Sequence, residues 1–120
     1  MKTAKIEIGG KEYFLTINNR VLKTFEDRGI KLDESIAGEA PVTRIVEIFC
    51  ILSDAGARYA KKMGLGNYEA ISEDDLLDLT GLDDFGNLVD VFTELAVGER
   101  TVDAELPAGK EEAVQTARMN

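Results

Sequence analysis

The sequence predicts an α+β domain that is mainly α: an N-terminal β-hairpin followed by about four helices, packed around one long apolar helix. Three observations lead to this prediction. Polar and apolar residues alternate around a Gly-Gly pair near the N-terminus, later segments repeat apolar residues at helical spacing, and large apolar residues become sparse after residue 98. A chain of 120 residues can bury one core. We therefore expect one domain over residues 1–98 and a flexible tail over 99–120.

The hairpin is expected over residues 4–17, in the segment KIEIGGKEYFLTI. Gly9-Gly10 supplies the positive φ angles that a two-residue hairpin turn requires. An isolated two-stranded ribbon is marginal in water, so its apolar face must pack on the helices. Phe14 is out of step with that face and is expected either to be exposed or to pack under the following helix. The alternating apolar residues are Ile6, Ile8, Tyr13, Leu15 and Ile17.

Helix starts and stops divide the rest of the domain. Asn18 or Asn19 is expected to cap the first helix, Ser72 the third and Asp83 the fourth, because side-chain oxygens at these positions accept free backbone N–H groups. Gly98 is expected to end the fourth helix. The predicted helices cover residues 18–28, 42–63, 73–80 and 84–97.

The helix over residues 42–63 is expected to form the centre of the core. Between residues 45 and 52 its only polar side chain is Glu47, and a helix that is apolar on nearly all sides is surrounded by neighbours. The β-branched residues of this block also suit a strand. The continuation to Lys61-Lys62 favours a helix, because cations complement a helix C-terminus.

Charge excludes two classes of partner. The net charge is −9, and residues 71–98 contribute −8 of it through eight acids without a Lys or Arg. A negative chain gains nothing from neutralising phosphates, so we expect no nucleic acid partner, and anionic membrane surfaces are disfavoured as well. The longest apolar block, IVEIFCIL, is too short to cross a membrane, and no apolar run follows the N-terminal charges. We expect a cytoplasmic protein.

Neither catalysis nor a cofactor or metal site is expected. The chain has no His, the commonest general base and metal ligand. Its only cysteine, Cys50, lies in the most apolar block, where a thiol without a base behaves as a small hydrophobe. The acidic stretch SEDDLLDLTGLDD, residues 72–84, does not place oxygen ligands at the alternate positions of a calcium loop.

Carboxylates are the best candidates for a partner-binding site. Five of the six acids in residues 72–84 lie at helix starts, where the helix dipole favours them. Asp78, Asp90 and Glu94 have no such reason, and the last two repel each other across one helical turn. The simpler interpretation is that these carboxylates only form a solvent-exposed face of the helices. The functional one is a surface that attracts a basic partner.

The functional interpretation places a groove between the long helix and the last helix. Asp78, Asp90 and Glu94 would form its rim, and Phe85 and Phe92 complete the candidate site, although Phe92 also suits the core. Such a groove would receive an amphipathic helix of another protein through anchors one helical turn apart.

The order of elements resembles the tail assembly chaperones of long-tailed bacteriophages of the siphophage type and of related prophages. The best matches are IGGKEY, residues 8–13, and SEDDLLDL, residues 72–79, within a similarity over about residues 5–97. The resemblance implies a non-catalytic protein of the host cytoplasm. It would bind the tape measure protein, a long aggregation-prone helical chain, keep it soluble and help bring the tail tube protein to it.

Other functions remain open on sequence grounds. A small structural protein of the virion, such as a component of the head–tail connector, would stay in purified particles, whereas a chaperone would be absent from them. An acidic mimic of DNA needs carboxylates at phosphate-like intervals, and here leucines interleave with them. A homo-oligomer is also compatible with the sequence.

Overall fold

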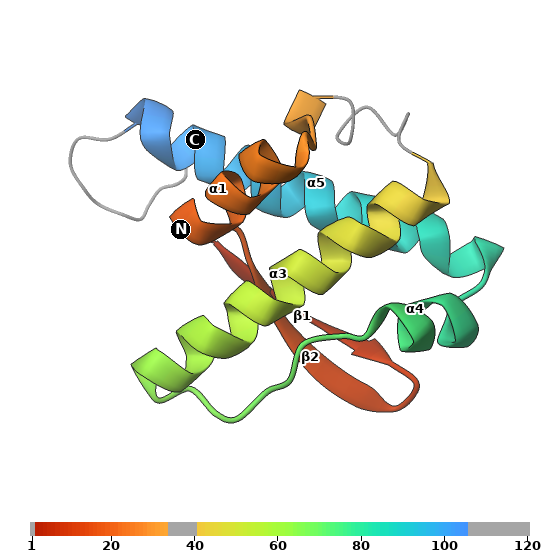
Figure 1. Ribbon diagram of the computed structural model, residues 1–120. Coiled ribbons are helices and arrows are strands. Elements are labelled where there is room, and N and C mark those ends of the chain that lie inside the picture. The colour runs from red at the N-terminus through yellow and green to blue at the C-terminus, as the bar shows by residue number, and fades with distance from the viewer. Residues whose placement is uncertain (1, 34–40, 106–120) are drawn as a thin grey trace.

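The computed structural model describes residues 2–33 and 41–105, with side chains through residue 97 (Figure 1). The chain is mainly helical and begins with an antiparallel hairpin, as the sequence predicts. Figure 1 shows α3 crossing the hairpin, with α4 near the hairpin turn. The elements are β1 (Thr3–Ile8), β2 (Lys11–Thr16), α1 (Asn19–Arg28), α3 (Val42–Met63), α4 (Glu73–Leu79) and α5 (Leu82–Glu105).

The hairpin turn consists of Gly9 and Gly10, whose φ angles are 61° and 81°. Both values lie in the left-handed region that side chains disfavour, which is why this turn needs glycine. The strands pair in register from Ile8 opposite Lys11 to Thr3 opposite Thr16. The expected hairpin is therefore confirmed, with its strands within residues 3–16.

The long helix α3 approaches the backbone of β2 so closely that only glycine fits at position 56. A Cβ atom at Gly56 would lie 2.5 Å from the carbonyl carbon of Phe14 and 2.9 Å from the Cα of Leu15. In a hairpin with a two-residue turn, the pair that flanks the turn is hydrogen-bonded and the bonded pairs then alternate. Phe14 falls in a non-bonded pair, so its carbonyl points away from β1. Hence α3 covers the outer edge of β2.

Both faces of β2 are buried from Tyr13 to Thr16 as a result. Leu15 faces the main core, whereas Phe14 lies on the opposite face between two tyrosines. The ring centroid of Phe14 is 6.3 Å from that of Tyr59 on α3 and 5.3 Å from that of Tyr68 in the following connection. The alternation of polar and apolar residues along a strand reveals only one buried face. Phe14 is on the other face, so the sequence left open whether it is exposed. The structure buries it because α3 and its connection reach the second face.

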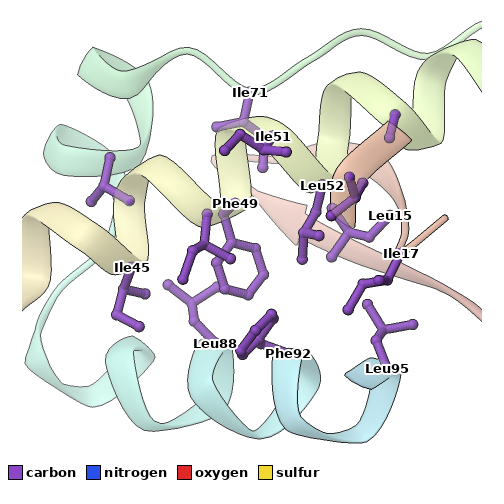
Figure 2. Close-up of a cluster of buried hydrophobic side chains, with 14 of the residues drawn as sticks. Leu15, Ile17, Ile45, Phe49, Ile51, Leu52, Ile71, Leu88, Phe92 and Leu95 are labelled. Carbon is purple, nitrogen blue, oxygen red and sulfur yellow. The ribbon is translucent and has the colours of Figure 1, made fainter. Parts of the chain in front are cut away.

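The main core fills the space between α3 and α5 (Figure 2). Large side chains of this kind each contribute about 1.5–3 kcal/mol when buried. The two ends of α3 lie outside this core. Its buried side chains run from Ile45 to Ala60, whereas Val42 and Met63 are 53% and 58% exposed. The core residues from these helices are Ile45, Phe49 and Leu52 of α3 and Leu88, Phe92 and Leu95 of α5.

A buried serine holds the connection between α3 and α4 against α3 through a hydrogen bond. The Ser53 side chain on α3 is fully buried, and its Oγ accepts a hydrogen bond of 2.7 Å from the backbone N–H of Ile71. The same hydroxyl donates to the carbonyl of Cys50 at 3.1 Å. At the surface, Lys11 of the hairpin forms an ion pair with Glu69 of this connection. The connection is thus held at both its buried and its exposed side.

Helix caps agree with the sequence at two of three starts. Asn18 Oδ1 accepts the N–H of Val21 at 3.2 Å, and Ser72 Oγ accepts the N–H of Asp75 at 3.1 Å. The expected Asp83 cap is wrong: α5 begins at Leu82.

Asp84 explains the earlier start of α5. Its carboxylate accepts the N–H of Gly81 at 2.8 Å, in the manner of a capping box.

The end of the last helix also differs from the prediction. Instead of ending at Gly98, α5 continues to Glu105. A glycine inside a helix costs about 1 kcal/mol relative to alanine, which lowers helix stability without ending the helix. Residues 99–105, which the sequence assigned to a tail, are therefore helical. The remainder of the predicted tail, residues 106–120, lies outside the described part of the chain.

Replacing Gly56 with alanine tests the α3–β2 contact. We expect Gly56→Ala to lower the free energy of unfolding by about 3 kcal/mol, because the new methyl group overlaps the β2 backbone. Gly86→Ala is the control, since a Cβ there meets nothing within 4 Å and alanine favours helix by about 1 kcal/mol. Urea unfolding measures both. Equal effects of the two substitutions would contradict the close contact.

Replacing Ser53 tests the fastening of the α3–α4 connection. Ser53→Ala leaves the buried N–H of Ile71 without its acceptor, which should cost about 1–3 kcal/mol. Hydrogen exchange at the Ile71 amide, followed by NMR, should become faster in the variant. The account of this connection fails if Ile71 keeps its protection.

Candidate functional site

The eight carboxylates of residues 71–98 are exposed, except for the half-buried Asp84, and they form no ion pairs in the described residues. Glu73, Asp74 and Asp75 occupy the first turn of α4, and Asp83 and Asp84 that of α5. The helix dipoles stabilise these charges locally. The field that they project into solvent is therefore predominantly negative, although Lys11 of the hairpin lies near enough to Asp75 to interact with it.

Three leucines among these acids are exposed to different extents, and Leu79 also packs against Gly9 of the hairpin turn. Leu82 is 96% exposed, Leu79 53% and Leu77 47%, whereas Leu76 is buried. Single exposed leucines are common on protein surfaces. Three within six residues, in a stretch where only Leu76 is buried, offer apolar surface that another molecule could contact. We call residues 72–84 the acidic segment.

The structure separates the residues of the predicted site into two groups. Asp78, Asp90 and Glu94 are exposed, the first on α4 and the others on α5. Phe85 is half-buried and packs against the core. Phe92 is fully buried, with its ring centroid 6.3 Å from that of Phe25 on α1. Including Phe92 in a contact surface was therefore wrong, because the closed domain does not expose it.

The groove expected between α3 and α5 is also absent from the described part of these helices. Figure 2 shows that side chains of both helices fill this space, including Ile45 and Phe49 opposite Leu88 and Phe92. Periodicity identifies the apolar face of a helix, but it does not reveal what covers that face. Here each helix covers the other. A client helix would have to contact the outside of the domain.

A small cavity lies between α1 and α3, and sequence reasoning did not find it. Its volume is about 220 Å³, and its lining includes Arg20, Arg28, Cys50 and Asp54. Ligand pockets usually measure about 300–1,000 Å³, so this space is small for an organic molecule. The lining comes from two helices that cross in space. No local motif marks such a crossing.

The polar groups of this cavity are largely engaged or inert. Arg28 pairs with Glu47 at 3.1 Å, and Asp54 pairs with Arg58 at 3.1 Å. Burial raises the pKa of the Cys50 thiol, so the thiolate that would act as a nucleophile is disfavoured. The acidic segment is the stronger candidate for a functional site.

Metal ligands do not converge in residues 2–33 and 41–97. No three His, Cys, Asp or Glu side chains there are close enough together to hold an ion. Within the described helices, none combines the length and the apolar content needed to cross a membrane.

Comparison with protein-family models, with curated proteins and with solved structures finds no match for this chain. The residues themselves are therefore the basis for the functional interpretation.

A pair of substitutions separates surface residues from core residues. Leu82→Ser should change the free energy of unfolding by no more than about 0.5 kcal/mol, because its side chain already lies in water. Phe92→Ala should cost about 3–5 kcal/mol through loss of burial and creation of a cavity. Chemical unfolding of the two variants checks this difference. A Leu82→Ser variant as unstable as Phe92→Ala would show that Leu82 packs inside the fold.

Proposed function

We propose that this chain is a tail assembly chaperone of a bacteriophage or prophage. It binds the tape measure protein in the host cytoplasm, keeps it soluble and assists assembly of the tail tube protein, without catalysing a reaction. The resemblance of IGGKEY (residues 8–13) and SEDDLLDL (residues 72–79) to this family supports the proposal. The exposed leucines of the acidic segment support it independently.

The observation that carries the proposal is the combination of exposed leucines and unpaired carboxylates. Leu77, Leu79 and Leu82 give a client apolar contacts, and burying one leucine contributes about 1.5–3 kcal/mol. Asp78 and Asp83 lie beside them in the sequence and are exposed. These carboxylates favour clients that carry Lys or Arg next to their apolar residues. An amphipathic basic helix has this combination.

The net charge suits the same role. A client that aggregates through apolar surface becomes more soluble when it is coated with chains of charge −9, because the coated complexes repel each other. Electrostatic attraction also accelerates the encounter with a basic segment and weakens with salt. The position of the acids at helix starts lets one set of charges stabilise the fold and attract the client.

Co-expression with the tape measure protein tests the proposal. The unmodified chain should keep that protein in the soluble fraction and co-purify with it. Leu77→Ser, Leu79→Ser and Leu82→Ser together should weaken binding at least tenfold, which is the effect of losing about 1.5 kcal/mol from a single leucine. Leu65→Ser is the matched control, because Leu65 is also 53% exposed but lies outside the acidic segment.

Two results would contradict the proposal. One is equal client solubility with the triple variant, the control and the unmodified chain. The other is retention of this protein in purified virions, which would favour a structural component such as a head–tail connector.

A further inference from the structure

The two edges of the hairpin differ in what covers them. The outer edge of β2 lies against α3 at Gly56. The opposite edge belongs to β1, which pairs only with β2 in the described ranges. The side chains of Thr3, Lys5 and Glu7 along it are exposed. An uncovered strand edge can pair with another strand, and proteins usually protect such edges.

The pairing register shows which backbone groups of β1 are free. Ile8 and Lys11 flank the two-residue turn and form a hydrogen-bonded pair, and the bonded pairs alternate from there. The N–H and C=O groups of Thr3, Lys5 and Glu7 therefore point away from β2. No residue in 2–33 or 41–105 hydrogen-bonds to these groups. The outward backbone groups of Thr3, Lys5 and Glu7 are thus available to form hydrogen bonds with a second strand.

The charges on this edge are unsatisfied inside one chain. Lys5 lies opposite Phe14, and Glu7 lies opposite Glu12, a like-charged pair that destabilises a hairpin. Neither Lys5 nor Glu7 forms an ion pair in the described residues. When two copies of the segment Lys5-Ile6-Glu7 run antiparallel, each Lys5 lies opposite the other copy's Glu7. The segment is therefore complementary in charge to a second copy of itself. A second copy of β1 is therefore the occupant that this edge fits.

We propose that two copies of this chain pair through β1, antiparallel and about a twofold axis at Ile6, to form one four-stranded sheet. Lys5 then lies opposite the partner's Glu7, and Glu7 opposite the partner's Lys5. These residues carry the free backbone groups, so each such pair exchanges two backbone hydrogen bonds. Ile6, which is half-buried in one chain, meets the partner's Ile6 on the core side of the sheet.

Charge selects this register over its neighbours. Only shifts by an even number of residues keep outward backbone groups opposite each other, and the nearest of these are shifts of two residues. One such shift places Lys5 opposite the partner's Lys5, and the other places Glu7 opposite the partner's Glu7. Both are like-charged pairs. The register centred on Ile6 is the one that joins opposite charges twice.

The charges of β1 are separate from those of the acidic segment. Residues 1–30 hold six basic and four acidic side chains, whereas residues 71–98 hold eight acids and no base. Pairing through β1 therefore depends on the local complementarity of Lys5 and Glu7 and not on the net charge of the two chains. The contact does not depend on the acidic segment, so this dimer and the proposed function can be tested separately.

Sedimentation equilibrium tests the proposal through charge reversal. The unmodified protein should form a dimer, twice the 13.1 kDa of one chain. Glu7→Lys places a second positive charge opposite the partner's Lys5 and should weaken the dimer at least tenfold. It also removes the Glu7–Glu12 repulsion, so the fold should not lose stability and thermal unfolding serves as a check. Lys5→Glu should weaken the dimer as well.

Combining the two changes gives the decisive readout. The double variant Lys5→Glu/Glu7→Lys restores both opposite-charge pairs and should dimerise like the unmodified chain. An equimolar mixture of the single variants should form mixed dimers. Lys62→Glu, an equal charge change at an exposed site on α3, should have no effect. A monomer at all concentrations, or a dimer that these β1 variants do not change, would overturn the proposal.

Discussion

The contact between α3 and the backbone of β2 at Gly56 sets the arrangement of the whole domain. Because no side chain intervenes, the helix crosses the outer edge of β2 in direct contact with Phe14 and Leu15 and covers the edge there. From that position its inner face meets α5 across the core, and its second half, with the following connection, covers Phe14 on the far side of the hairpin. One small residue thus lets a two-stranded sheet, which is marginal alone, become buried on both faces of β2.

What this packing leaves uncovered is as informative as what it buries. The β1 edge and the acidic segment are on the outside, and each carries charges without partners in the described residues. The acids of α4 and α5 stabilise helix starts, which explains their position, but helix capping does not explain the exposure of Leu82. The binding role that we propose accounts for both features, because apolar contact supplies affinity while charge selects and attracts the client.

Local signals in the sequence predicted the elements well. Gly9-Gly10 specifies a turn through its own backbone, and Ser72 specifies a helix start through a bond only three residues long. Features that depend on distant residues were not predictable. The need for glycine at position 56 comes from a strand some forty residues earlier in the sequence. The groove between α3 and α5 was wrong because two apolar faces that appear free in the sequence cover each other, and Phe92 was misplaced for the same reason. The helical extension past Gly98 shows that one unfavourable residue does not outweigh its neighbours.

The central claim is that the client binds to the outside of a closed domain, at the acidic segment. Hydrogen–deuterium exchange of the chain, alone and with a soluble segment of the tape measure protein, tests this most directly. The account predicts added protection in residues 72–84 and unchanged exchange in the helical segments that face each other across the core, residues 45–56 of α3 and 88–96 of α5. Protection that avoids the acidic segment, or faster exchange across the α3–α5 core on client binding, would contradict it.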